Sequence, residues 1–410
     1  MKLLGLQETD WLTRGPHTQH HIFERLSIND NFQITVFDYD IDKILRLGSL
    51  IIKKQIYTGI HRAVKDSKVT IIRTAHIQIP FLRRISSLIS TFFELLKHVR
   101  KDRPDTIISF SITNGLIGLI FAKLFRIPYI FYYIDLLHTL VPIPYAQNFA
   151  RMTSRILFKK SDHIVVVTDF LQKYVLNEGV ESKKVSILLN GISLENTLVN
   201  PEKLNSLRSK LDIKESDFVI LYMGYLYDFA GLKEIIDQYH SDVSIGKLNI
   251  KFIIVGDGGI YSDLLKYIKE IGANWVVMTG KVPFFEITEY LELADLCLMS
   301  FALNNVTKDI TPVKIMEYMA MKKPVLSNSL PSVVKEIGEN NGVIFARNQK
   351  ELIKAIGELS NKKETLKEIG LQGFALIKKH YIWPKILNKL KEIMISLIKE
   401  KRHKKQIDFS

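Results

Sequence analysis

The sequence predicts an α/β protein built from two Rossmann-like, doubly wound domains. Short, continuously apolar runs alternate with helical patterns in both halves of the chain, which is typical of parallel sheets covered by helices on both faces. A polar and charged stretch over 194–216 separates the two halves. The length of 410 residues also fits two or three domains better than one.

The composition is that of a globular chain with an excess of positive charge. The hydrophobic fraction is 47% and the charged fraction 24%, so sizeable cores are expected. The 57 Lys and Arg outnumber the 43 Asp and Glu, and a net charge of +14 suits phosphorylated substrates, an anionic membrane surface or nucleic acid. Nucleic acid is the weakest of these, because no zinc-finger spacing, basic zipper or aromatic RNA-binding signature is found. The single cysteine, Cys297, lies in an apolar run and suits a reducing compartment.

Neither a signal peptide nor a membrane-spanning helix is expected. The apolar run at the amino terminus is short and meets acidic residues at once. The most apolar region, 106–133, is interrupted by Lys123, Arg126 and Pro128. The sequence therefore predicts a cytoplasmic protein.

The first half opens with a strand over 1–8, a turn that contains Arg14 and Gly15, and a helix that begins near 17. A strand, turn and helix of this kind can receive a phosphate at the helix start. A metal site on the first turns of this helix is an alternative, because i, i+4 pairs can bind zinc, but no recognised spacing supports it. Helix-start residues that line a cleft are the simpler interpretation of the polar set His17, His20, His21 and Glu24.

The rest of the first half continues the alternation of strands and helices. Segment 41–65 has a helical look, and 81–100 is an amphipathic helix with basic ends. The latter either faces the core with a solvated edge or lies on an anionic membrane. Further helices are expected over 114–125 and 150–158, and further strands over 32–39, 69–73, 105–111, 128–135, 163–168 and 187–191.

Two polar residues follow the predicted strand over 128–135. Asp135 ends this strand, and His138 comes three positions later. Because functional groups collect beyond the carboxyl ends of strands in open α/β sheets, both are candidate site residues. Hydrogen bonding within the loop is the alternative.

The second half repeats the same rhythm. Its glycine-rich turn over 256–259 does not have the spacing of the dinucleotide fingerprint. Helices are expected from Gly231, over 261–272, 286–294 and 349–377, and as a long basic helix after Tyr381; the strands are 218–224, 251–255, 275–280, 295–300, 325–329 and 343–346.

The stretch DITPVKIMEYMAMKKP, which starts at Asp309, predicts a short helix with a ligand-binding start. Thr311 is expected as the N-cap and Pro312 at the first helical position. The helix start and Lys314 together favour a phosphate. Glu317, one turn further, could accept hydrogen bonds from the vicinal hydroxyls of a ribose, and Asp309 could hold hydroxyls beyond the phosphates. A solvated salt-bridge face is the alternative.

The order and approximate spacing of these motifs resemble GT-B glycosyltransferases of the family 4 type, the glycosyl transferases group 1. The resemblance covers nearly the full chain and implies two Rossmann-like domains that face a cleft, over 1–190 and 191–380. The segment 381–410, with a helix from Trp383, resembles the crossover helix and a basic tail. The motifs that carry the resemblance are NG (190–191), MGYL (223–226), VGDGG (255–259), TGKV (279–282) and TPVKIMEYMAMKKPV (311–325).

The resemblance also implies roles for individual residues. Asp309 and Glu317 match the paired acids of the family, which would bind sugar and ribose hydroxyls respectively, and Lys314 would meet the diphosphate. Backbone around Lys281 would face the base, and the turn at Gly15 would approach from the first domain. The implied donor-binding set is Arg14, Gly15, Gly224, Tyr225, Gly280, Lys281, Val282, Thr311, Lys314 and Glu317, and the catalytic set is Asp135, His138 and Asp309.

The sequence departs from the family pattern at four positions. The first of the paired acids is Asp309 rather than Glu, which has a shorter reach and the same charge. Many members carry Arg and Lys after the first strand of the second domain, where this chain has Tyr225 and Ala230. The diphosphate would then rely on Lys314, Arg14 and helix termini. The histidine common at the end of the 128–135 strand is replaced by Ile134, and Asp135 or His138 would substitute for it.

The resemblance implies a retaining, metal-independent hexosyltransferase. It would move a sugar from a nucleotide-diphosphate donor to a lipid-linked or polysaccharide acceptor, in cell-envelope polysaccharide synthesis, without a cofactor and without nucleic acid. It would work in the cytoplasm or peripherally on the inner face of the membrane. A nucleotide-sugar epimerase of the same architecture and a non-catalytic GT-B scaffold are the alternatives.

Overall fold

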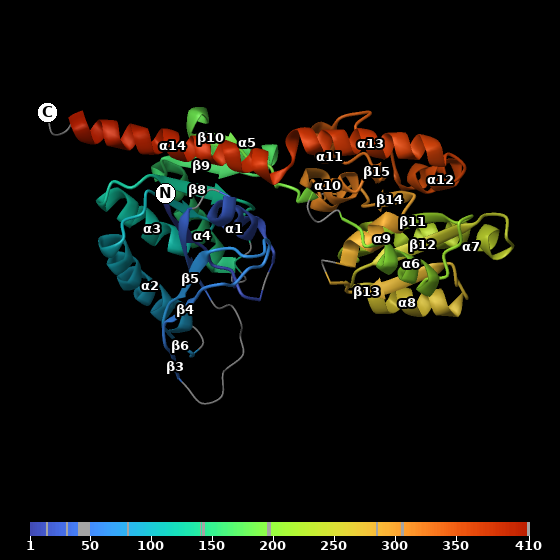
Figure 1. The fold of residues 1–410 in the computed structure, drawn as a ribbon, viewed down its shortest axis with the longest axis horizontal. Coiled ribbons are helices and arrows are strands. Elements are labelled where there is room, and N and C mark those ends of the chain that lie inside the picture. Colours follow the sequence, from blue (N-terminus) through green and yellow to red (C-terminus); the bar gives the residue numbers. More distant parts are fainter. Residues whose placement is uncertain are drawn as a thin grey trace. The chain divides into compact units, whose positions relative to one another are not determined.

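The chain folds into two compact units, each built around a mainly parallel sheet (Figure 1). Unit 1 comprises Met1–Gly191 and Trp383–Ser410, and unit 2 comprises Ile192–Ile382. The expected α/β class with two Rossmann-like domains is confirmed, while the cleft between them stays a prediction. The computed structural model describes residues 1–13, 15–29, 32–39, 50–79, 82–139, 141, 144–194, 198–283, 286–304 and 307–407.

Unit 1 contains an eight-stranded sheet in the order β10-β9-β8-β7-β1-β2-β5-β4. Its neighbours are parallel except β4 and β5, and β3 and β6 form a separate antiparallel pair. The helical look of 41–65 is wrong for the described part of that segment, where β3 and β4 lie. The strands are β1 (Lys2–Leu6), β2 (Gln33–Asp38), β3 (Ile51–Ile52), β4 (Gln55–Tyr57), β5 (Val69–Arg73), β6 (His76–Ile77), β7 (Thr106–Ser109), β8 (Tyr129–Tyr133), β9 (His163–Val166) and β10 (Val185–Ile187).

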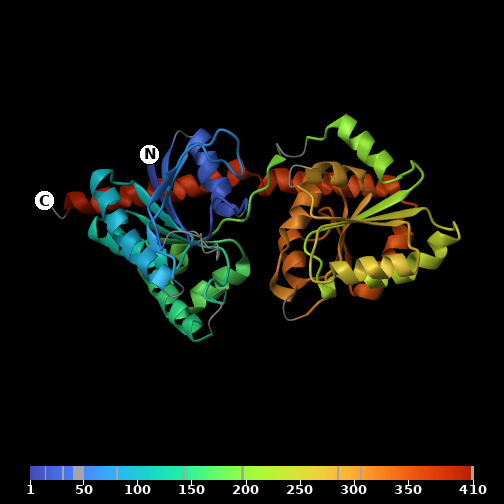
Figure 2. The same ribbon diagram turned by 90° about the horizontal axis from the view of Figure 1, so that it is seen from below.

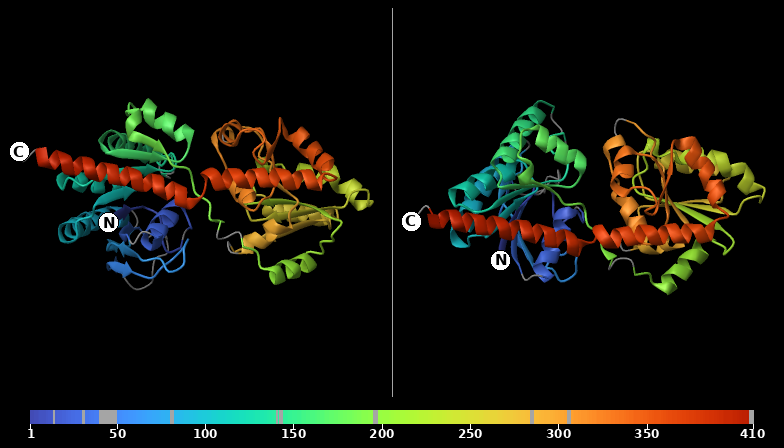
Figure 3. Two further views of the ribbon diagram at one scale, coloured as in Figure 1. Left: turned by 45° about the horizontal axis from the view of Figure 1, so that its top comes forward. Right: turned by 90° about the horizontal axis from the view of Figure 1, so that it is seen from above.

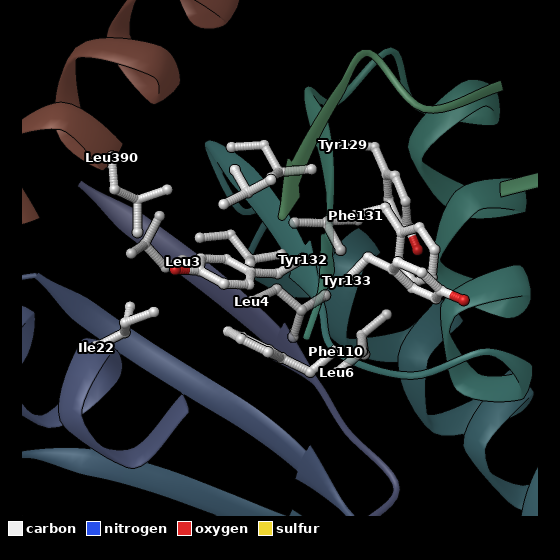
Figure 4. Close-up of a cluster of buried hydrophobic side chains, with 14 of the residues drawn as sticks. Leu3, Leu4, Leu6, Ile22, Phe110, Tyr129, Phe131, Tyr132, Tyr133 and Leu390 are labelled. Carbon is white, nitrogen blue, oxygen red and sulfur yellow. The ribbon is translucent and has the colours of Figure 1, made fainter. Parts of the chain in front are cut away.

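Apolar residues on both faces of the central strands make the core of unit 1. Every residue of β8 is buried, as a continuous apolar run in a parallel sheet requires. Figure 4 shows Leu3 of β1 between the aromatic side chains of β8 and Leu390 of the last helix. The helices of this unit are α1 (Thr18–Asn29), α2 (Leu82–Lys101), α3 (Thr113–Leu124), α4 (Pro144–Lys160), α5 (Asp169–Asn177), the short 3-10 helix η1 (Ser182–Lys184) and α14 (Trp383–Ile407).

The last helix, α14, belongs to the first unit although it ends the chain (Figure 3). The ring of Trp383 stacks on His21 of α1, with ring centroids 4.9 Å apart. Trp383 also covers Gly191, where any larger side chain would collide with the indole. The predicted helix from Trp383 is therefore present, and its first turn is fixed by aromatic packing.

Helix α2 is amphipathic, as predicted. Of the apolar side expected from the sequence, Leu95 is buried, and Phe92 and Leu96 are partly buried against the core. That expected side consists of Leu82, Ile85, Leu88, Ile89, Phe92, Phe93, Leu95 and Leu96. The buried side consists of Ser87, Thr91, Leu95 and Val99. Several large apolar side chains of this helix consequently point to solvent. Within the described residues, no helix is both long and apolar enough to cross a membrane.

Unit 2 contains a six-stranded parallel sheet in the order β13-β12-β11-β14-β15-β16. Its strands are β11 (Phe218–Met223), β12 (Ile250–Val255), β13 (Val276–Gly280), β14 (Leu296–Met299), β15 (Val325–Asn328) and β16 (Val343–Ala346). Its helices are α6 (Pro201–Lys210), η3 (Asp228–Ala230), α7 (Leu232–Ser244), α8 (Tyr261–Glu270), α9 (Ile287–Leu293), η5 (Thr307–Asp309), α10 (Val313–Ala320), α11 (Pro331–Ile337), α12 (Gln349–Leu359) and α13 (Lys363–His380).

Candidate functional site

The strand order of unit 2 reverses between β11 and β14, and this is where open α/β sheets bind ligands. Gly224, the first residue after β11, has φ +129° and donates its N–H to Val255 O over 2.9 Å. Gly256, with φ +133°, packs so closely on Gly224 that a Cβ would lie 2.0 Å from its carbonyl oxygen. Only glycine fits both positions. The ends of β11 and β12 thus expose backbone at the switch point.

Helix α10 brings charged side chains to this edge. It begins at Val313 with Pro312 in the N-cap position and without a side-chain cap, so the predicted N-cap role of Thr311 is wrong. Its buried side includes Tyr318, whose hydroxyl oxygen accepts from Met223 N over 2.9 Å. This contact joins the helix to the end of β11. No acidic residue occupies its first turn, which leaves the positive end of the dipole uncompensated locally.

Lys314 lies in an aromatic enclosure. Its Nζ donates to the Tyr222 hydroxyl over 3.1 Å and lies 4.2 Å from the centroid of that ring. The ring of Phe301, just after β14, is 4.5 Å away on another side. Burial lowers the pKa of Lys314 to about 7, against the opposing field of Glu317. A Cβ added at Gly224 would lie 3.0 Å from Nζ, so the ammonium group also adjoins the exposed backbone.

Glu317 lies one turn further on the same helix and is half-buried. Among the residues that the structure describes, no hydrogen-bond donor reaches its carboxylate and no salt bridge joins it to Lys314. Burial raises the pKa of Glu317, and the field of Lys314 offsets part of this rise. A half-buried carboxylate without donors is costly unless a ligand supplies them. Hydroxyl groups are suitable donors.

The other donor residues predicted in unit 2 are placed around the same sheet edge or before α10. Tyr225 follows Gly224, is 55% exposed and contacts the ring of Tyr227 at 4.6 Å between centroids. Gly280, with φ +70°, ends β13 and accepts from Gly256 N over 2.9 Å. After it come Lys281, which is exposed, and Val282, which is half-buried.

Asp309 and Thr311 lie on the segment that leads into α10. Asp309 ends η5 and is exposed, and Thr311 is half-buried. Ser332 of α11 donates to Ile310 O over 2.6 Å and so holds this segment. No described contact joins Asp309 to Lys314 or Glu317. Its role stays a prediction.

In unit 1 the predicted turn after β1 is organised by histidine. Gly15 has φ +93°, and a Cβ there would collide with His17 N and the His20 ring. His20 Nδ1 accepts from His17 N over 3.0 Å, so its protonated Nε2 donates to Trp11 O over 3.2 Å. Burial lowers the pKa of His20 to about 4, so the ring is neutral. Arg14 lies outside the described residues.

Glu24, the acidic member of the polar set on α1, has backbone partners. Its carboxylate accepts hydrogen bonds from the backbone N–H groups of Arg62, Ala63 and Val64. The described part of the chain brings together no group of three or more His, Cys, Asp or Glu side chains suited to a metal ion. Glu24 thus holds a loop, and His20 holds the turn.

Asp135 and His138 follow β8, as expected, but they do not contact each other. Asp135 is exposed and its Oδ1 accepts from Leu136 N over 2.7 Å. The His138 ring stacks parallel to Tyr174 of α5, with centroids 6.0 Å apart. Its Nδ1 is buried and has no hydrogen-bond partner in the described residues, and burial lowers the pKa of His138. Their catalytic roles stay predictions.

Sequence reasoning missed the aromatic residues that surround Lys314. Tyr222 belongs to β11, and Phe301 is the second residue after β14. Neither lies on α10, the helix that carries Lys314. The hydroxyl-bearing residue within the otherwise apolar run FVILYM was the available signal for Tyr222. Phe301 carried no comparable signal.

Comparisons with known proteins assign this architecture to a class. The family Glycosyltransferase Family 4 matches residues 53–196, and the family Glycosyl transferases group 1 matches residues 217–362. The chain is 23% identical over 311 residues to the uncharacterized glycosyltransferase MJ1069 of Methanocaldococcus jannaschii, covering 70% of this chain and 73% of the relative. It is 27% identical over 183 residues to the putative teichuronic acid biosynthesis glycosyltransferase TuaH of Bacillus subtilis, covering 44% and 43%.

Solved structures share the whole fold. Anabaena HepE in complex with UDP has a TM-score of 0.68 at 16% identity, covering 97% of this chain and 100% of the other. The same protein in complex with UDP-glucose has a TM-score of 0.65 at 17% identity, with the same coverage. Sucrose-phosphate synthase from Thermosynechococcus elongatus has a TM-score of 0.66 at 14% identity, covering 98% and 100%.

The chain is therefore a glycosyltransferase of the GT-B fold. Its first unit carries the Glycosyltransferase Family 4 domain and its second the Glycosyl transferases group 1 domain, which confirms the family 4 resemblance seen in the sequence.

Proposed function

We propose that this glycosyltransferase binds a nucleoside diphosphate sugar at the switch point of unit 2. Lys314 and the start of α10 contact the diphosphate, Glu317 accepts from the two ribose hydroxyls, and the backbone from Gly280 to Val282 faces the base. Thr311, Gly224 and Tyr225 line the phosphate side. The observation that carries this proposal is the half-buried Glu317 carboxylate, which no hydrogen-bond donor reaches among the residues described by the structure, next to an enclosed lysine.

The reaction we propose is the transfer of a hexosyl group, with retention, to a lipid-linked or polysaccharide acceptor. Asp309 would hold the sugar hydroxyls, Arg14 and Gly15 would approach from the first unit, and Asp135 or His138 would act at the reacting carbon. Lys314 and the helix dipole supply positive charge for the leaving diphosphate, so the reaction would not require a metal ion. The TuaH relative, whose name states teichuronic acid biosynthesis, supports a cell-envelope polysaccharide as the acceptor.

The first donor to test is a uridine diphosphate sugar, because HepE was solved with UDP and with UDP-glucose. We propose that the enzyme works in the cytoplasm, peripherally at the inner membrane face, where lipid-linked acceptors are available.

Calorimetry with uridine, adenosine and guanosine diphosphates and their sugars tests the donor site. We expect one base to bind, and Glu317→Gln to weaken that binding about tenfold or more, because a hydrogen bond to a charged group is worth roughly 1.5–3 kcal/mol. Glu270→Gln, a matched change of an exposed acid on α8, is expected to leave binding unchanged. Equal binding by both variants would disprove the assignment of Glu317, and an absence of binding across the panel would favour a scaffold.

A further inference from the structure

Helices α2, α3 and α4 form one layer over the sheet of unit 1 (Figure 2). Phe92 of α2 contacts Phe121 of α3, with ring centroids 4.9 Å apart. Gly115 of α3 lies against Leu157 of α4, because a Cβ there would be 3.6 Å from a methyl carbon of that leucine. The three helices therefore present one continuous outer surface, which we call the α2–α4 face.

The α2–α4 face exposes an unusual number of large apolar side chains. Their spacing of three or four residues places them along one side of each helix. Each such side chain forgoes roughly 1.5–3 kcal/mol that burial would contribute, and large exposed apolar patches mark interaction sites. The set is Ile85 (55% exposed), Ile89 (54%), Phe93 (63%), Ile120 (48%), Leu124 (66%), Phe149 (60%), Met152 (53%) and Ile156 (41%).

The same three helices are strongly basic. They contain ten Lys and Arg and a single acidic residue, Glu94, which is paired with Lys54. Four of these cations pair with acids of neighbouring elements: Arg84 with Glu8, Lys123 with Asp162, and both Arg151 and Arg155 with Glu178. The three helices therefore combine exposed apolar side chains with an excess of positive charge. Charge and apolar exposure together are typical of segments that lie in an anionic membrane interface.

A cavity of about 550 Å³ opens at the edge of this face, at the amino-terminal ends of β7 and β8. Leu124, a member of the apolar set, also lines the cavity. Arg103, which donates to Phe125 O over 2.7 Å, lies on one side, and Lys401 and Arg402 of α14 lie on the other. Arg126 completes four cations. Lys401 pairs with Asp162 over 2.8 Å, and Arg402 lies 3.9 Å from Asp105, the acidic lining residue. The cavity therefore suits a phosphate group attached to an apolar body.

We propose that the α2–α4 face docks on an anionic phospholipid bilayer, with its apolar side chains in the interface and a lipid phosphate in the cavity. A second copy of the chain is the less favourable occupant, because two such faces would bring two surfaces with an excess of positive charge together. The proposal rests on the peripheral location proposed above, but not on the transfer reaction.

Flotation with vesicles tests the docking face. The full-length protein is mixed with phosphatidylcholine vesicles that contain or lack phosphatidylglycerol, at low and high salt. We expect binding that requires phosphatidylglycerol and weakens with salt. The double variant Ile89→Ser, Phe93→Ser is expected to lower the bound fraction about tenfold. Leu371→Ser, an equally exposed apolar residue on α13 of unit 2 (54% exposed), is the matched control and should bind like the parent.

The cavity has its own variants. Arg103→Ala and Arg402→Ala are each expected to weaken binding several-fold, whereas Lys266→Ala on α8 should leave it unchanged. Equal flotation without phosphatidylglycerol, or an unchanged double variant, would overturn the proposal. A concentration-dependent dimer that the double variant abolishes would overturn it in favour of a second copy.

Donor calorimetry on the same preparations separates the two proposals. Flotation without donor binding would support the docking face and disprove the proposed donor site. Donor binding without flotation would support the donor site and overturn the docking face.

Discussion

The charged side chains at the carboxyl ends of the two sheets differ in how many protein partners they have. In unit 1 the buried Arg73 bonds Asp10 over 2.7 Å and also bonds Asp38, and Glu8 accepts from the first N–H groups of α3. In unit 2 the half-buried Glu317 receives no donor from the described residues, and Lys314 contacts only a phenol hydroxyl and two aromatic rings. Unit 1 therefore uses its charges for its own stability, while unit 2 keeps them available for a ligand.

The largest expected effect comes from removing the cation of the fully paired charge network in unit 1. Arg73→Leu would leave Asp10 and Asp38 buried without a cation, and breaking a buried pair costs about 3–5 kcal/mol. Burial opposes ionisation of Asp10, but Arg73 holds its pKa below the usual range, and this support would be lost. Urea unfolding should show the loss, while nucleotide affinity of the folded protein should not change.

Arg347→Leu is the matched control for that experiment. Arg347 is exposed and pairs with Glu351 one turn away, so its loss is expected to leave the stability nearly unchanged. Similar losses from both variants would show that the Arg73 network is not a structural centre.

In unit 2, Lys314→Met is expected to weaken nucleotide binding and to raise the stability of the fold. Removing a cation from the diphosphate should lower nucleotide affinity about tenfold to a hundredfold, since a charge-assisted hydrogen bond is worth roughly 1.5–3 kcal/mol. The melting temperature should rise by a few degrees, because a desolvated ammonium no longer opposes folding. Lys266→Met, at an exposed position, should change neither quantity. A melting temperature that falls would show that Lys314 stabilises the fold.

A smaller effect is expected at the glycine that adjoins Lys314. Gly224→Ala introduces strain at φ +129° of about 1–3 kcal/mol and places a methyl group 3.0 Å from Nζ. Gly246→Ala has strain at φ +73° but nothing within 4 Å, so it serves as a control for backbone effects. Calorimetry should show weaker nucleotide binding only for Gly224→Ala; a loss in both variants would point to folding instead.

The smallest effect is a dependence of nucleotide affinity on pH. The pKa of Lys314 is lowered to about 7 by burial, so the free enzyme loses this charge as pH rises through 7. A bound diphosphate favours the charged form, and affinity should fall by at most about tenfold per pH unit above 7. Lys314→Arg keeps its charge and should flatten this dependence. An identical slope in both proteins would exclude Lys314 as the titrating group.

The same lysine links pH to folding. In the unfolded chain the pKa of Lys314 returns to the ordinary lysine value of 10.5, so the unfolded state binds more protons between pH 7 and 10.5. The contribution of Lys314 to stability therefore rises with pH across this window.

Much of the fold could be predicted because its strands are buried on both faces. The runs that became β8, β11 and β12 are continuously apolar, and this pattern is independent of which strand lies beside which. The Lys314 and Glu317 pair could also be predicted, because a spacing of three on a helix places two side chains on one face. The amphipathic pattern of α2 could be predicted, but the pattern alone left open whether its apolar side faces the core or an anionic membrane.

The alternation of strands and helices, the charged pair on α10 and the excess of positive charge could be predicted, because each depends on local order or on composition. The enclosure of Lys314 by Tyr222 and Phe301 could not be predicted in this way. Neither could the contacts of Arg73 with Asp10 and Asp38, or the burial of Ser87 and Thr91 in place of Ile89 and Phe93. These are contacts between segments far apart in the chain. They follow from strand order and helix rotation, which packing of the whole unit determines.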